Sequence, residues 1–237
     1  VILSLMKEVI LRLSDSRSSV NIYNMKGDIY HITNRGVEKR KIFLSDGYYF
    51  RFINSLKDFN NVNSAPRSYY ERRAYNLAMR KPDEELVDII CVCLMPNHYH
   101  ILVQEKVDGG AGLFSKKISS GYTQFFNLEN DRSGVLFQGR TKIIPVDNDA
   151  HYLHLPFYIF LNPIKLIDSE WKEKGVKNYK KAVDFLKDYK WSSFGETILG
   201  NKKGPFTNIV NSKLFFDLFD TDSKRFKKDI FEWLNNK

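Results

Sequence analysis

Two histidines, a tyrosine and an asparagine have the types and spacing that metal-assisted chemistry requires. His98 and His100 are two residues apart within the apolar run 89–103. Side chains on a strand alternate between faces, so the two imidazoles project from one side of a sheet and can converge on a divalent ion. Tyr158 and Asn162 are four residues apart, so on a helix a phenol and an amide share one face. The four side chains together predict an active site.

Hydrophobic periodicity and turn residues predict the helices and strands that must position these residues. The order of strand, helix, strand, strand, helix, strand and helix predicts a ferredoxin-like α+β fold, an antiparallel sheet with helices on one face. A helical C-terminal extension follows and ends in a helix over 223–234. Pro156 predicts a break in the last helix of the domain, with a fresh helix starting at the proline. The predicted elements are strands at 28–34, 87–94, 98–104 and 141–146, and helices at 47–59, 113–128 and 148–162.

The chain is predicted to have three parts. Residues 1–25 form an N-terminal lead segment, either an amphipathic helix or a leader before a natural start at Met25. Residues 26–166 form the domain that carries the candidate site. Residues 167–237 form a lysine-rich accessory region. Within the domain, residues 60–84 form a long polar excursion that is partly helical around 70–79.

Composition restricts the partners. The chain has 37 basic and 28 acidic residues, a formal net charge of +9 and a pI near 9.3, which favours an acidic polymer as partner. No apolar stretch approaches the roughly 20 residues that span a bilayer, so no membrane association is expected. Cys91 and Cys93 are predicted to be small strand residues without a disulfide, as suits the cytoplasm.

Four sequence blocks, in this order, resemble those of the REP-associated tyrosine transposases, the single-tyrosine branch of the HUH endonucleases. The resemblance extends over about residues 26–200 and includes WSSF at 191–194. The blocks are GDIYHITNRG at 27–36, MPNHYHILV at 95–103, LFQGR at 136–140 and YIFLNP at 158–163.

The resemblance implies cleavage of hairpin-forming single-stranded DNA by a tyrosine that becomes joined to the 5′ phosphate, in DNA transposition or the mobilisation of repeated palindromes. It implies that Tyr158 is the nucleophile, that His98 and His100 bind Mg²⁺ or Mn²⁺, and that Asn162 is a third ligand. It favours a monomer over a homodimer. We assign DNA-backbone contacts to five basic residues, namely Arg35, Lys39, Arg40, Arg140 and Lys142.

Alternatives remain open for each of these assignments. The two histidines could be strand residues satisfied by their neighbours, Tyr158 could be a core aromatic, and Asn162 could be a helix cap before Pro163. His31, on the first strand, is predicted to be structural. Two other functions also fit the sequence: a catalytically silent nucleic-acid binder on the same scaffold, and a metal-dependent hydrolase that uses water instead of tyrosine.

Overall fold

The structure is a computed structural model that describes residues 27–63 and 84–235. The predicted lead segment and the helix predicted around 70–79 lie outside the described residues. The elements, in chain order, are β1 (Ile29–Arg35), η2 (Val37–Lys39), α2 (Asp46–Asp58), β2 (Val87–Met95), β3 (His98–Glu105), α4 (Gly110–Glu129), β4 (Lys142–Pro145), α5 (Asp149–Leu161), η3 (Asn162–Leu166), α6 (Trp171–Lys174), α7 (Tyr179–Asp188), α8 (Phe194–Thr197), α9 (Ser212–Leu218) and α10 (Ser223–Asn235).

The four strands form one antiparallel sheet in the order β2-β3-β1-β4. The strand order and the two helices between the strands are those of a ferredoxin-like fold, which confirms the predicted α+β class. A two-residue turn, Pro96 and Asn97, joins β2 to β3. The central strands β3 and β1 are therefore the ones that carry His98, His100 and His31.

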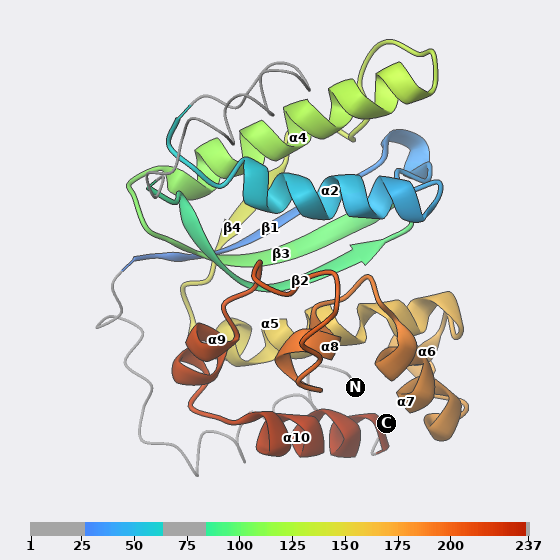
Figure 1. The fold of residues 1–237 in the computed structure, drawn as a ribbon. Coiled ribbons are helices and arrows are strands. Elements are labelled where there is room, and N and C mark those ends of the chain that lie inside the picture. Colours follow the sequence, from blue (N-terminus) through green and yellow to red (C-terminus); the bar gives the residue numbers. More distant parts are fainter. Residues whose placement is uncertain (1–26, 64–83, 236–237) are drawn as a thin grey trace.

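Helices α2 and α4 cover one face of the sheet (Figure 1). In α2 the buried residues Tyr49, Phe52, Ile53 and Leu56 follow the 3.6-residue period, which turns one apolar stripe toward the strands. Alternate residues of the sheet pack against this stripe. They include Ile32 of β1 and the residues on either side of His100 in β3. The histidines of β3 consequently point to the opposite face.

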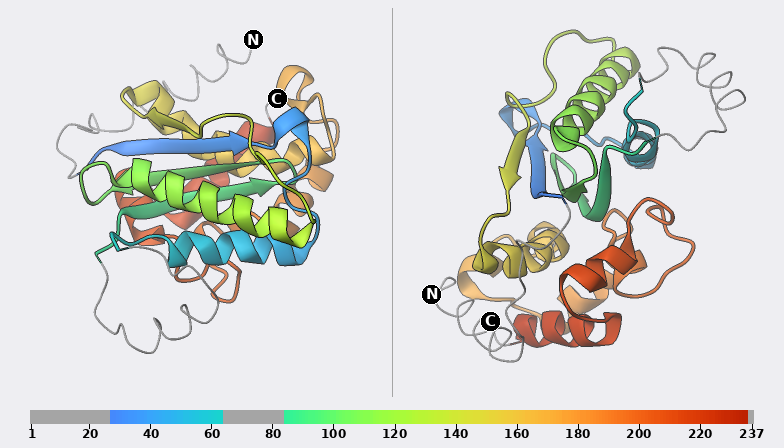
Figure 2. Two further views of the ribbon diagram at one scale, coloured as in Figure 1. Left: turned by 90° about the horizontal axis from the view of Figure 1, so that it is seen from above. Right: turned by 90° about the vertical axis from the view of Figure 1, so that its left-hand side faces the viewer.

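The opposite face of the sheet is covered by α5 and by helices of the C-terminal extension, as the two views of Figure 2 also show. The sequence of α5 is apolar around most of its circumference, which suits a helix enclosed between a sheet and other helices. Phe160 of α5 contacts the rings of Phe194, Phe215 and Phe226 at centroid distances of 5.6, 5.8 and 6.0 Å. The C-terminal extension therefore shares a hydrophobic core with the face of the sheet that bears the histidines.

The predicted break at Pro156 is wrong. Helix α5 runs from Asp149 to Leu161 with Pro156 inside it, and the Asn148 side chain caps its start by accepting a hydrogen bond from the His151 amide at 2.8 Å. A proline removes one amide donor from the helical ladder, here the one that would meet the Tyr152 carbonyl. Burial of α5 on both sides compensates for that loss, so a single helix carries Tyr158.

Two further predictions concern cysteines and membranes. Cys91 and Cys93 are buried thiols without a disulfide, as predicted. Both point into the core beneath α5, where a β-bulge between Ile89 and Cys91 adjusts the register of β2. None of the helices described in the structure has the length and apolar character needed to cross a membrane.

Candidate active site

Three of the four sequence blocks meet at the end of the sheet where β1 ends and β3 begins. The Gly36 amide donates to the Asn97 carbonyl at 2.9 Å, and the Gln138 amide donates to the Arg35 carbonyl at 2.7 Å. A Cβ atom on Gly36 would lie 2.4 Å from the Arg40 carbonyl oxygen, so this crossing requires glycine. The backbone contacts between these blocks hold the turn that precedes His98.

Asn97 orients His98. Its side-chain oxygen lies 2.7 Å from Nδ1 of His98, and its side-chain nitrogen donates to the Lys39 carbonyl at 3.1 Å. An amide oxygen only accepts hydrogen bonds, so Nδ1 of His98 must carry the proton. In the neutral ring this leaves the lone pair on Nε2, the atom that can bind a metal.

His31 orients His100 in a similar way. Nε2 of His31 lies 2.9 Å from Nδ1 of His100, and the two rings stack with centroids 5.1 Å apart. Nε2 of His100 is buried and has no hydrogen-bond partner among the described residues. If Nδ1 of His100 donates to His31, then Nε2 of His100 also presents a lone pair. A buried imidazole nitrogen that lacks a partner among the described residues is suited to bind a metal ion.

Helix α5 and the following η3 bring Tyr158 and Asn162 to the same histidines. The ring of Tyr158 lies 5.2 Å from that of His100, edge to face, and only partly buried. Asn162 is 2% exposed, and its side-chain nitrogen has no hydrogen-bond partner in the described structure. The spacing of four residues in the sequence therefore does place the phenol and the amide together, beside the imidazoles of β3.

The C-terminal extension adds a cation to this group. Lys172 is in α6, and its ammonium nitrogen lies 4.2 Å from the centre of the Tyr158 ring. Such a contact is favourable because the face of an aromatic ring carries partial negative charge.

Burial keeps the histidines neutral. Desolvation lowers the pKa of His31 and of His98 to about 4, and it lowers the pKa of His100 well below its usual value. The positive charges of Arg35 and Lys172 lower the pKa of both His98 and His100 further. Hydrogen bonding to the Asn162 side chain, by contrast, raises the pKa of His98. At neutral pH the imidazoles are therefore unprotonated, as ligands must be.

The donor set fits a divalent metal ion. Two imidazole nitrogens and one amide oxygen leave coordination positions open for water and substrate, as in catalytic sites. The Asn162 side chain is close enough to His98 to raise its pKa, so the third predicted donor lies beside the first. Imidazole ligands favour Mn²⁺ over Mg²⁺, which prefers oxygen. No group of three or more His, Cys, Asp or Glu that could hold a metal is found among the described residues, so a three-ligand site here would need a donor of another type, such as the amide of Asn162.

The basic residues predicted to contact DNA do not form one group. Arg35 is exposed and close enough to affect His98 and His100, and Lys142, also exposed, pairs across the sheet with Thr33. Lys39 and Arg40 lie between β1 and α2, where the Lys39 carbonyl contacts Asn97. Arg140 lies elsewhere and lines a cleft on the α4 side of the sheet. Their contacts with DNA stay predictions.

Sequence reasoning did not identify three residues that contact the site. Asn97 could have been found, since an amide directly before a ligand histidine in a turn is within reach of its ring. His31 pairs with Leu102, so it is the diagonal neighbour of His100, and only the β1–β3 register reveals that relation. Lys172 was noticed only as one of several lysines that could bind the DNA backbone, and nothing in the sequence linked it to Tyr158.

No protein-family model matches this chain, and no curated protein matches it. Among solved structures, the chain is similar to one described as the REP-associated tyrosine transposase bound to a REP hairpin, with 21% sequence identity and a TM-score of 0.45. The alignment covers 77% of this chain and 86% of that chain. That protein is of the family that the four sequence blocks resemble.

Proposed function

We propose that this protein is a metal-dependent endonuclease and strand transferase that acts on single-stranded DNA with hairpin structure. The observation that carries the proposal is the convergence of His98, His100, Asn162 and Tyr158, which come from β3, α5 and η3. Such enzymes act in transposition or in mobilising repeated palindromes, the activity implied by the resemblance of the sequence blocks.

The chemistry assigned to the chain is a transesterification. The Tyr158 oxygen attacks a backbone phosphorus, so that a tyrosine–phosphorus bond forms and the bond from phosphorus to the 3′ oxygen breaks. The phenol proton passes to solvent and the leaving 3′ oxygen takes up a proton. A bound Mn²⁺ or Mg²⁺ would neutralise charge that develops on the phosphate oxygens. Because the intermediate conserves the energy of the phosphodiester, a 3′ hydroxyl can reverse the step and join strands.

The described residues around the histidines have specific parts in this step. Asn97 and His31 hold the two rings through their Nδ1 atoms, so that both Nε2 atoms would be free to bind a metal ion. Lys172 stabilises negative charge on the attacking phenol oxygen, and Arg35 binds the phosphate backbone beside His98. The net charge of +9 favours approach of the polyanion to this region.

The test is covalent trapping. Single-stranded DNA that forms a hairpin and carries a label at its 3′ end is incubated with the protein and Mn²⁺, and products are separated in SDS. We expect a labelled protein band that disappears with Tyr158→Phe or EDTA. Tyr179→Phe, which alters a half-exposed tyrosine of α7, is the matched control and should retain the band.

The outcomes separate the three candidate functions. Binding without cleavage under any divalent metal supports the silent binder, and cleavage without an adduct supports the hydrolase that uses water. Either result overturns the proposed tyrosine mechanism.

A further inference from the structure

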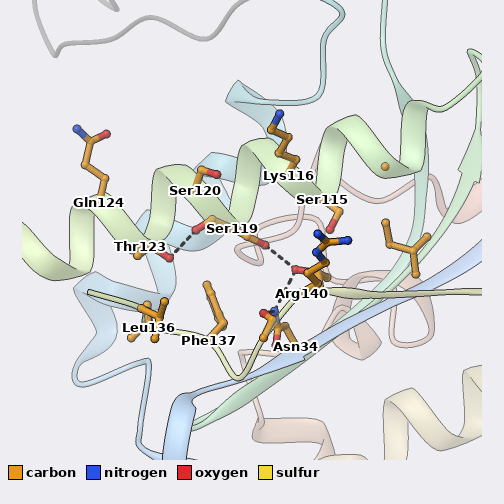
Figure 3. A pocket seen from close by; sticks show the side chains of 15 residues that line it. Asn34, Ser115, Lys116, Ser119, Ser120, Thr123, Gln124, Leu136, Phe137 and Arg140 are labelled. Carbon is orange, nitrogen blue, oxygen red and sulfur yellow. Dashed lines mark hydrogen bonds between the residues drawn. The ribbon is translucent and has the colours of Figure 1, made fainter. Parts of the chain in front are cut away.

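All five histidines of the chain gather on one side of the sheet. Three belong to β1 and β3, and two belong to α5, the helix that covers this face. None of the five lines the cleft on the opposite face, between α4 and the segment that leads into β4 (Figure 3). The roles described above for the three histidines of the sheet leave the two of α5 unassigned. The five residues are His31, His98, His100, His151 and His154.

His154 contacts the proposed nucleophile. Its ring centre lies 6.5 Å from that of Tyr158, and the two rings are tilted by 39°. The two residues are four positions apart on α5, so they lie one turn apart on the same face of the helix. Long side chains on a helix lean back toward its N-terminus, over the residue three or four positions earlier. The phenol of Tyr158 therefore extends toward the turn that carries His154.

The other neighbours of Tyr158 are less suited to accept its proton. His31 and His100 are buried and contact each other through ring nitrogens 2.9 Å apart, so a proton added there would place a charge in apolar surroundings. The ammonium of Lys172, over the Tyr158 ring, has no lone pair to offer. His154 is partly exposed, so its imidazole can accept a proton and exchange it with water.

We propose that His154 is the general base for Tyr158, an inference that rests on the proposed function. The imidazole accepts the phenol proton, directly or through one water, while the phenol oxygen attacks phosphorus. The imidazolium then releases this proton to solvent. When a 3′ hydroxyl reverses the step, the same imidazolium protonates the tyrosine oxygen as its bond to phosphorus breaks. One side chain therefore serves both cleavage and joining.

The experiment measures the rate at which the covalent adduct forms in a single turnover, with saturating hairpin DNA and excess Mn²⁺. His154→Ala removes the imidazole, and His154→Gln keeps a polar side chain of similar length that is not a base. General bases contribute about 100- to 10,000-fold to a rate, so we expect both variants to be slower by about 100-fold or more. Their affinities for DNA and Mn²⁺ should equal those of the parent, because His154 is outside the ligand set.

Chemical rescue separates a proton-transfer role from a packing role. Imidazole added to the solution should restore part of the rate of His154→Ala, because the position is partly exposed and the small base can enter the space left by the side chain. It should not accelerate His154→Gln, in which that space is filled. The matched control is His151→Ala, which removes the other partly exposed imidazole of α5 and should form the adduct at the parent rate.

The remaining outcomes overturn the inference in distinguishable ways. If the parent forms the adduct and both His154 variants form it at the same rate, His154 is not the base and the proposed function stands. A slow His154→Ala that imidazole does not restore, or an equal loss in His151→Ala, shows that α5 needs these side chains for packing, and the inference is again wrong. If the parent forms no adduct with any divalent metal, the proposed function fails together with the inference.

Discussion

Acid should unfold the metal-free protein in a pH range set by its buried histidines. His31, His98 and His100 are each no more than 8% exposed, and burial lowers the pKa of His31 and His98 to about 4. In the unfolded chain their pKa returns to about 6.5. The unfolded state therefore binds more protons than the native state between these values, so stability is complete above about pH 6.5 and falls as the pH drops toward 4.

The size of this effect follows from the two pKa values. Each histidine of this kind removes about 1.4 kcal/mol of unfolding free energy per pH unit between about pH 6 and pH 4.5, which amounts to roughly 2 kcal/mol between pH 7.5 and pH 5. His31 and His98 together remove roughly 4 kcal/mol, and His100 acts in the same direction. Domains have total stabilities of about 5–15 kcal/mol, so the loss is large enough to bring the native state close to unfolding.

The assay is urea denaturation followed by circular dichroism, with EDTA present, at several pH values between 7.5 and 5. His31→Leu is the informative variant, because it removes one of the three histidines. It should reduce the loss of unfolding free energy between pH 7.5 and pH 5 by roughly 2 kcal/mol, whatever its effect on stability at pH 7.5. An unfolding free energy that stays constant over this range in the parent protein would show that the histidines are not held neutral by burial.

Three further predictions concern metal binding and the backbone crossing. His31→Leu should weaken Mn²⁺ binding, measured by calorimetry, by about 10- to 100-fold because His100 loses the partner that orients it, and unchanged affinity would contradict that role. Asn162→Asp should tighten Mn²⁺ binding and improve Mg²⁺ binding by supplying a charged oxygen, whereas weaker binding of both ions would remove Asn162 from the ligand set. Gly36→Ala should destabilise the protein by about 1–3 kcal/mol in urea denaturation, because its Cβ atom would lie 2.4 Å from the Arg40 carbonyl oxygen; Gly195→Ala is the control, and equal stabilities would contradict the close approach.

Much of the fold was predictable because its signals are local. The apolar periods of 47–59 and 113–128 and the alternation at 28–34 correspond to α2, α4 and β1. The order of elements then restricted the topology to a ferredoxin-like sheet. The prediction at Pro156 failed because the sequence does not show that α5 is enclosed by the sheet and the C-terminal helices, whose packing stabilises a continuous helix.

The candidate site, like the fold, was only partly predictable from the sequence. The alternation of strand side chains placed His98 and His100 on one face, and helical spacing placed Tyr158 and Asn162 on another, both from the sequence alone. The tertiary structure decided that these two faces meet and that His31 contacts His100. It also decided that the Lys172 ammonium lies over the Tyr158 ring. Periodicity within one element fixes which side chains share a face, because it depends only on backbone geometry. Contacts between residues as distant as His31 and His100 depend on strand register and on the packing of helices, which arise only when the whole core is formed.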